Sequence, residues 1–371
     1  MRTLFVARKN LLEQPFRLAI SVAGVGLSVM LVLVMWAILQ GIVGQAGAFV
    51  RNTDAQVWIV QEGFTDISHG LSVVPRSLER RLERMPGVRD ANPLTGARLE
   101  LPVPTGGKDS LSIVGYDTRT GVGGPWSFAE GDRGPRRGEV VVDETFAETT
   151  GFAVGDELPV PGDPLRIVGL SAETNQFVNQ IAFAPLQDVA RLARLRADVN
   201  FFALRVREGR TGAVVDRIAE ELDGVTAFTK AQFTANNERE VKEGFQPILY
   251  VMVAIAFGVG LAIVGLTMYT AAVEKAREFG ILSAIGADRR ALSRIVLGQA
   301  LITSALGFVV GALLVVPAGW VIGELAPKTE LRLTPGLFAV VAASSLLMAI
   351  LASVVPVRRI AGLDPAAVFR A

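Results

Sequence analysis

Four long apolar stretches, none containing a charged side chain or a histidine, constrain the fold of this chain more than any other feature. They lie at Leu18–Val43, Ile248–Val273, Ile295–Ile322 and Leu333–Val357. Roughly 20 such residues are enough for a helix to cross the hydrocarbon core of a bilayer. Because the backbone must satisfy its own hydrogen bonds in lipid, each stretch is expected to be a helix. The sequence therefore predicts an integral membrane protein with four transmembrane helices, at 18–43, 247–273, 295–322 and 333–357.

A polar segment, residues 44–246, separates the first span from the second and has the pattern of a folded α+β domain. Strands are predicted at 55–60, 88–103, 110–116, 139–143, 166–170, 201–206 and 225–228, and helices at 75–85, 144–150 and 211–222. Strand, helix and strand recur on both sides of residues 121–198, which begin with a stretch rich in glycine and proline. We expect a β-rich insertion there. Residues 230–244 are predicted to be a helix that continues into the second span.

The placement of charge, and not its sum, is informative. The net charge of +1 gives no reason to expect nucleic acid as a partner. Basic residues gather in segments 1–17, 274–294 and 358–371, which the positive-inside bias places in the cytoplasm. Both termini are then cytoplasmic, segment 1–17 forms a short helix at the inner face, and domain 44–246 lies outside. The apolar core of a secretory signal is about 7 to 15 residues long, and the first apolar stretch is longer, so we expect it to remain uncleaved as the first transmembrane helix. The predicted location is the bacterial cytoplasmic (inner) membrane.

Residues capable of catalysis or metal binding are scarce. The chain has no cysteine and one histidine, His69, which is expected to be a surface loop residue. The acids Asp143, Glu144 and Glu148 lack calcium-loop spacing and are expected to form a solvated face. The motifs H-E-x-x-H, G-x-S-x-G and G-x-x-x-x-G-K-[ST] are all absent. We therefore predict no catalytic residue, no metal site and no cofactor in this chain, and any ATP-driven work would need another polypeptide.

The segment between the second and third spans, residues 274–294, is predicted to be a helical hairpin. Gly286 suits the position that ends a helix, and Asp288 suits the N-cap of the next one. Ile281, Leu282 and Ile285 fall on one side of the first helix. Such an apolar face fits a groove on a cytoplasmic partner. An ordinary loop whose apolar residues touch the membrane accounts for the pattern equally well.

The pattern Glu274-x-x-Arg277-Glu278-x-Gly280-x-x-x-Ala284-x-Gly286 resembles the signature of the permeases of the MacB/FtsX family of ABC transporters, with Phe279 as a departure where an aliphatic residue is usual. Pro356-Val357-Arg358-Arg359-x-Ala361-x-Leu363-Asp364-Pro365 is similar to the family's C-terminal ending. Gly138-Glu139-Val140-Val141-Val142-Asp143 with Gly151-x-x-x-Gly155-Asp156 is similar to its extracytoplasmic insertion. The one-plus-three order of spans is also the family's. The match is typical of a DevC-like single-permease subunit.

This resemblance implies a permease that works with a separate cytoplasmic ABC ATPase, which binds the ATP and Mg. The residues it assigns to ATPase coupling are Glu274, Arg277, Glu278, Gly280, Ile281, Leu282, Ala284, Ile285 and Gly286. It also implies a homodimer and a possible periplasmic adaptor. Small residues that would let helices approach are Gly24, Gly26, Gly258, Gly260 and Gly265, although packing within one subunit uses the same residue types.

Two functions remain open. The chain could be the transmembrane subunit of an exporter that moves a hydrophobic or amphipathic substrate by transmitting motion to its outer domain. Alternatively, it could transport nothing and regulate an extracytoplasmic partner such as a cell-wall hydrolase by mechanotransmission. A sensor or anchor without an ATPase is a third possibility.

Overall fold

The structure, a computed structural model, describes residues 15–67, 72–131, 134–175, 180–195, 197–275, 277–278, 281 and 288–361. The chain divides into two compact units. The helical unit takes its described residues from 1–40, 245–325 and 331–371, and the α+β unit consists of 41–244 and 326–330. The short helix predicted before Pro15 and the tail predicted after Ala361 lie outside the described residues.

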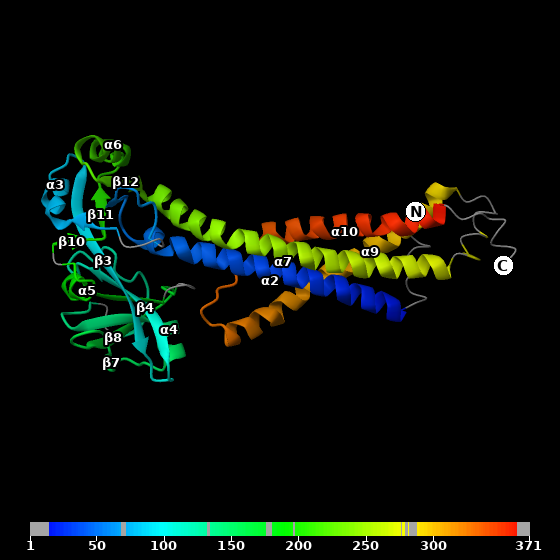
Figure 1. The fold of residues 1–371 in the computed structure, drawn as a ribbon, viewed down its shortest axis with the longest axis horizontal. Helices are drawn as coiled ribbons and strands as arrows, with labels where there is room; N and C mark the ends of the chain where they lie inside the picture. The colour runs from blue at the N-terminus through cyan, green and yellow to red at the C-terminus, as the bar shows by residue number, and fades with distance from the viewer. Residues whose placement is uncertain are drawn as a thin grey trace. The chain divides into compact units, whose positions relative to one another are not determined.

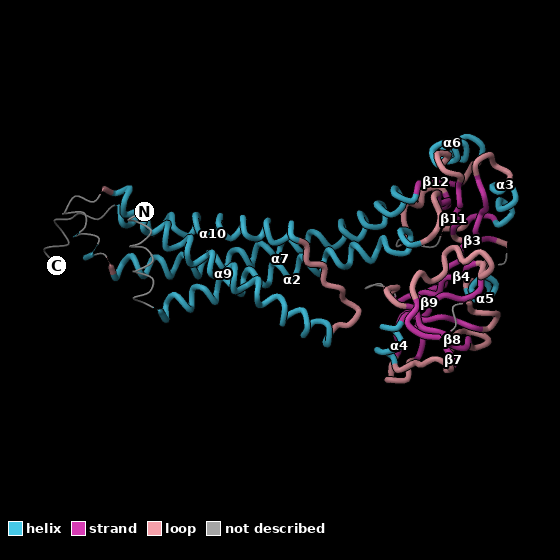
Figure 2. Tube along the Cα trace, turned by 180° about the vertical axis from the view of Figure 1, so that it is seen from behind, coloured by secondary structure: helices cyan, strands magenta, loops and turns pink. Residues whose placement is uncertain are grey.

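Four long helices form the helical unit: α2 (Pro15–Asn52), α7 (Lys230–Glu274), α9 (Arg289–Leu325) and α10 (Pro335–Ala361). All four are long and apolar enough to cross a membrane. They lie side by side in both views of the chain (Figures 1 and 2). Leu33 of α2, Val264 of α7, Val315 of α9 and Ala349 of α10 are fully or almost fully buried in their common core. The predicted four-helix membrane protein with an inserted α+β domain is therefore confirmed.

Two of these helices extend beyond the helical unit. Residues 41–52 of α2 and 230–244 of α7 belong to the α+β unit. α7 begins directly after strand β12 (Val225–Thr229) and continues without a break through Pro247. The expectation that residues 230–244 continue into the second span is correct.

A ten-stranded sheet organises the α+β unit, with the path β12-β1-β11-β3-β4-β9-β6-β8-β5, and β7 pairs with β8 off this path. The long strand β3 (Val88–Pro102) divides it. Residues Val88–Leu94 of β3 pair with β11, and Thr95–Pro102 pair with β4. We call the part that includes β12, β1 and β11 lobe 1, and the part from β4 onwards lobe 2. The further strands are β1 (Val57–Gln61), β4 (Lys108–Tyr116), β5 (Phe128–Gly131), β6 (Glu139–Asp143), β7 (Glu157–Leu158), β8 (Leu165–Ser171), β9 (Gln180–Pro185) and β11 (Phe201–Val206).

Short helices cover both lobes. Lobe 1 carries the turn η1 (Arg76–Leu78), α3 (Glu79–Glu83), α6 (Thr211–Glu221) and the small ladder of β2 (Val74–Pro75) with β10 (Asp198–Val199). Lobe 2 carries α4 (Glu144–Thr150) and α5 (Leu186–Leu192). α4 matches its predicted range because Asp143 caps it at the start and Gly151, with φ of 84°, ends it in the left-handed conformation.

The boundary predicted for the β-rich insertion, near residue 121, does not coincide with a boundary of the sheet. β4 precedes that residue, yet it pairs in parallel with β9 over Leu111–Tyr116. Lobe 2 therefore begins within β3, and it shares one continuous sheet with lobe 1. Three of its strands, β5, β7 and β9, were not predicted. β5 lies inside the stretch rich in glycine and proline, where composition favours a loop.

Candidate functional site: the two ends of helix α7

The C-terminal end of α7 is joined to the start of α2 by an ion pair. The Arg17 guanidinium donates two hydrogen bonds to the Glu274 carboxylate, at 2.9 and 2.6 Å. This two-point geometry is the strongest that an arginine and a carboxylate can form. The Arg17 side chain is 26% exposed and that of Glu274 52% exposed. Glu274, to which the family resemblance assigns a role in ATPase coupling, is therefore engaged within its own chain.

Part of the predicted coupling segment can be placed. Arg277, Glu278 and Ile281 are helical, and the Ile281 side chain is 40% exposed. Lys275 Nζ lies 3.7 Å from Glu278 Oε2. α9 begins at Arg289, directly after the predicted N-cap Asp288. Gly280, Leu282, Ala284, Ile285 and Gly286 lie outside the described residues, so the hairpin and its role in coupling stay a prediction.

The glycines predicted to serve helix packing fall into two groups. A β-carbon at Gly24 would lie 2.7 Å from Ile263, one at Gly26 would lie 3.1 Å from Val310, and one at Gly260 would lie 2.7 Å from Met348. These three positions are used for close packing inside the subunit. A β-carbon at Gly265 would meet only the Ala352 carbonyl, at 3.9 Å, and one at Gly258 would have no described atom within 4 Å. Gly258 thus faces away from the helices of its own chain.

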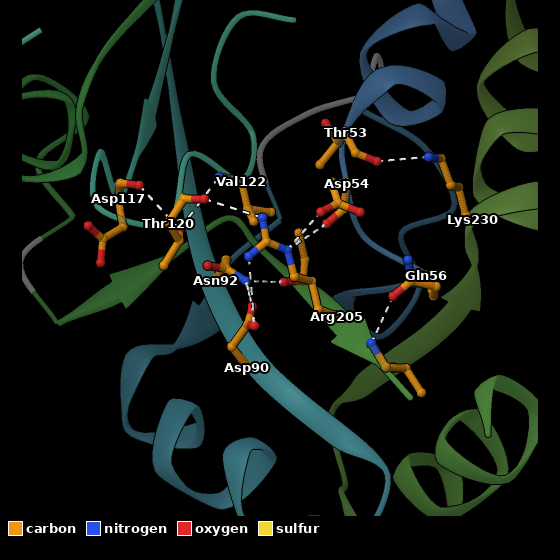
Figure 3. Close-up of polar contacts among 12 residues, drawn as sticks. Thr53, Asp54, Gln56, Asp90, Asn92, Asp117, Thr120, Val122, Arg205 and Lys230 are labelled. Atoms are coloured by element: carbon orange, nitrogen blue, oxygen red, sulfur yellow. Dashed lines mark hydrogen bonds and ion pairs between the residues drawn. The ribbon is translucent and has the colours of Figure 1, made fainter. Parts of the chain in front are cut away.

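The N-terminal end of α7 is fixed to the end of α2 and the segment after it by polar contacts, of which Figure 3 shows the one between Lys230 and Thr53. The Lys230 ammonium donates to the carbonyl of Thr53 at 2.8 Å, and the Lys230 amide donates to the carbonyl of Gln56 at 2.9 Å. Farther along, Arg51 of α2 lies 2.6 Å from Glu238 of α7. Both long helices are therefore held where they meet lobe 1.

Arg205 of β11 connects this junction to the rest of the sheet (Figure 3). Its Nε lies 3.0 Å from Oδ2 of Asp54, in the segment between α2 and β1, and its Nη1 lies 3.9 Å from Asp90 of β3. Its Nη2 also donates to the carbonyl of Thr120, at 3.3 Å, in the loop after β4. One guanidinium thus touches the segment after α2, lobe 1 and the first loop of lobe 2.

An aromatic cluster also joins α2 and α7 to lobe 1. Phe233 of α7 stacks on Trp58 of β1 at 5.3 Å between ring centroids, and on Phe228 of β12 at 5.8 Å. Phe49 of α2 meets Trp58 edge to face at 5.8 Å. Phe49, Trp58 and Phe233 are all buried. Buried aromatic pairs contribute about 0.5 to 1.5 kcal/mol each beyond their burial, so this end of α7 is anchored firmly.

The acids predicted to form a solvated face include one that is fully buried, which corrects that expectation. The Asp143 side chain caps α4 by accepting from the Thr145 amide at 2.9 Å, and it accepts from the Thr174 hydroxyl at 2.6 Å. Burial raises the pKa of Asp143 above its ordinary value, against the lowering effect of these hydrogen bonds. Burial and the neighbouring Asp143 also raise the pKa of Glu144, whereas Glu148 is exposed. Among the described residues no group of three or more His, Cys, Asp or Glu side chains could hold a metal ion.

Comparison with known families assigns both parts of the chain. The model of the FtsX-like permease C-terminal matches residues 250–365, and the model of the MacB-like periplasmic core domain matches residues 18–222. The chain belongs to the MacB/FtsX family of ABC transporter permeases. The resemblance predicted from the pattern at 274–286 is thereby confirmed.

Relatives of this MacB/FtsX permease match it over different lengths. An uncharacterized ABC transporter permease of Mycobacterium tuberculosis is 26% identical over 369 residues, covering 99% of each chain. The macrolide export ATP-binding/permease protein MacB of Agrobacterium fabrum is 26% identical over 226 residues, covering 57% of this chain and 34% of that protein. The crystal structure of the periplasmic region of MacB from Actinobacillus actinomycetemcomitans aligns with a TM-score of 0.39 at 13% identity, covering 51% of this chain and 95% of that structure.

Several contacts of this permease were missed by sequence reasoning. Arg17 and Glu274 lie 257 positions apart, and nothing in the local sequence links them. Nothing in the local sequence distinguishes Arg205 from the other arginines of the domain. Nothing there indicates the contact of Lys230 either, because its partner is a main-chain carbonyl. Trp58 and Phe233 each lie in a predicted element, but only the fold brings them together.

Proposed function

We propose that this chain is the transmembrane subunit of an ATP-driven exporter and transmits motion from a separate cytoplasmic ATPase to its α+β domain. The observation that carries the proposal is the continuity of α7, a single helix of 45 residues. At one end Lys230 and Phe233 fix it to lobe 1, and at the other it leads into the coupling segment that begins at Glu274. The helix continues through Pro247, which removes one main-chain hydrogen bond but does not end α7, so a displacement at the coupling segment would reach lobe 1.

The partner ATPase would bind ATP and Mg, since the sequence contains no G-x-x-x-x-G-K-[ST] motif. The basic residues near the start of α9 and the end of α10 favour a cytoplasmic location for the coupling segment and both termini. The α+β domain would then lie outside the membrane. The Agrobacterium fabrum relative is named for macrolide export, which supports a hydrophobic or amphipathic substrate.

A second copy of the chain is the proposed partner within the membrane. The open face of α7 carries small residues at helical spacing, Ala254, Gly258 and Ala262, all exposed. Small residues on an exposed face allow close approach of another helix in lipid. A periplasmic adaptor is a further possible partner of the outer domain, by analogy with the family.

Replacing Ile281 with Asp tests the proposed coupling. The Ile281 side chain is 40% exposed and would enter an apolar groove of the ATPase, where an unpaired carboxylate is costly. We expect the tagged wild-type chain, purified from its native membranes, to retain an ABC ATPase, and the Ile281→Asp variant to lose it.

Val154→Asp is the matched control, because Val154 is 39% exposed but lies in lobe 2. It should retain the ATPase. Equal recovery of the ATPase with Ile281→Asp and with the control would refute the coupling assignment. Failure of the wild-type chain to retain any ATPase would refute the proposed function itself.

A further inference from the structure

Part of the connection between α9 and α10 groups with the α+β unit. We call its residues Ala326–Glu330 the strap. Lys328 Nζ donates to Asp109 Oδ2 at 2.7 Å. Asn175 Nδ2 donates to the carbonyl of Lys328 at 3.2 Å. Asp109 belongs to β4 and Asn175 follows β8, so both contacts tie the strap to lobe 2.

The strap also lies against α2. A β-carbon at Gly41 would be 1.8 Å from the Glu330 carbonyl oxygen, so no side chain fits between the two backbones. Inside the strap, the Thr329 amide donates to the Ala326 carbonyl at 2.9 Å, which closes a turn that presents Lys328. Backbone contacts on one side and the Lys328 ion pair on the other therefore fix its position.

The Lys328 ion pair is better placed than a typical surface pair. The two side chains are only 29% and 27% exposed. Ion pairs between fully exposed groups contribute little, because solvent screens them and long side chains lose freedom. Here, partial burial and the second contact from Asn175 reduce both the screening by solvent and the loss of side-chain freedom.

The two lobes are thus attached to different parts of the chain. Lobe 1 is held by the ends of α2 and α7, through Lys230 and the stacked pair of Trp58 and Phe233. Lobe 2 is held by the strap, which is covalently continuous with α9 and α10. Within the sheet, the change of pairing partner in β3 between Leu94 and Thr95 marks where the lobes meet.

We propose that the Lys328–Asp109 pair is a coupling contact that makes lobe 2 follow α9 and α10, while lobe 1 follows α7. ATP-driven movement of α7 against α9 and α10 would then change the separation of the lobes. The inference rests on the proposed function, because it needs a partner ATPase to supply the movement. Lys328 is in this sense a positioning residue.

Spin labels on the two lobes test this directly. The chain has no cysteine, so Val73→Cys beside β2 and Val154→Cys in lobe 2 give one label at an exposed position in each lobe, and dilution with unlabelled chain isolates the distance within one subunit. The distance between the labels is measured by pulsed electron resonance in the full-length complex with its ATPase, with and without ATP. The variants are Lys328→Asp, Asp109→Lys and the double exchange.

We expect ATP to shift the label distance in the otherwise wild-type complex. Each single charge reversal should lose that shift while the ATPase still co-purifies, and the double exchange should restore it. A wild-type shift in both single reversals would overturn the inference, as would an absent shift in the wild-type complex with its ATPase bound.

If the proposed function is wrong, the result differs, because the chain then purifies without an ATPase. The strap contact is then tested in the chain alone. Each single reversal should broaden the distribution of label distances, and the double exchange should narrow it again. An unchanged width in both single reversals would show that the pair does not hold lobe 2.

Discussion

The Phe233 ring at the start of α7 stacks on the Trp58 indole of β1, with 5.3 Å between the ring centroids and an angle of 28° between the planes. Within the part of the chain that the structure describes, the buried Trp58 Nε1 has no hydrogen-bond partner. An unsatisfied buried donor costs about 1 to 3 kcal/mol, so packing and not polar bonding holds Trp58 in place. The contact is the apolar half of the joint between α7 and lobe 1.

Removing the Phe233 ring should therefore weaken this joint. Phe233→Ala is expected to lower the free energy of unfolding of the α+β domain by about 3 to 5 kcal/mol, as is usual for a buried phenylalanine. The measurement is denaturant unfolding of the full-length chain in detergent. Phe245→Ala on the same helix is the control, because Phe245 is 38% exposed, and it should change the value by less than about 1 kcal/mol. Similar effects of the two variants would contradict the anchoring role.

The buried carboxyl of Asp143 should make stability depend on pH. Burial raises its pKa in the folded chain above the ordinary value of 3.8, so the folded state holds this proton more tightly than the unfolded state. Its contribution is fully present below pH 3.8 and is lost as the pH rises through the raised folded value. Asn keeps a side-chain oxygen for the cap of α4 but does not ionise.

The stability of Asp143→Asn relative to wild type should accordingly increase as the pH rises from about 3 to 7. Unfolding of both chains measured across this range gives the difference, in which most other carboxyl groups cancel. Thr149→Ala, which removes a hydroxyl bonded to the carbonyls of Thr145 and Phe146 and not to Asp143, should show a difference that is nearly independent of pH. A flat profile for Asp143→Asn would mean that the pKa of this carboxyl is not raised.

Much of the fold follows from local sequence pattern. The four apolar stretches fix the membrane helices, and a strong local signal fixes α4, where Asp143 and Gly151 cap a short helix. Strand β11 is also correctly bounded, because its residues are apolar except for Arg205 and it is flanked by the polar Asn200 and Arg207. In each case the residues that decide the element lie within it or directly beside it.

The parts that escaped prediction depend on contacts between distant residues. β4 reads as a strand, but only its parallel partner β9 shows that it belongs to lobe 2. In the sequence, Asp143 is one of three nearby acids. Only the fold shows that the Thr174 hydroxyl and the surrounding core exclude water from it. The contacts of Arg17, Lys328 and Arg205 each join segments far apart in sequence. A local sequence pattern does not indicate which distant residues will pair.

The pairing of Glu274 with Arg17 predicts that this carboxylate is not needed to bind the ATPase. Glu274→Gln should leave ATPase recovery unchanged, since the group is already engaged by its own chain. Its effect on stability should stay below about 1 kcal/mol, because a pair this exposed is screened by solvent. Co-purification checks the first point and thermal unfolding the second. Loss of the ATPase with Glu274→Gln but not with Arg17→Gln would place the Glu274 carboxylate in the interface.

The contrast between Gly258 and Gly260 predicts which helix face meets a second copy. A cysteine at Gly258 would point away from the helices of its own chain, whereas one at Gly260 would point at Met348 and Ser28. Under mild oxidation in native membranes, Gly258→Cys should form a disulfide-linked dimer and Gly260→Cys should not. Gly258→Leu should then weaken dimerisation, measured by dilution in detergent, because the larger side chain prevents close approach of the two helices. A cross-link through Gly260 alone, or none through either position, would exclude this face of α7 as the dimer contact.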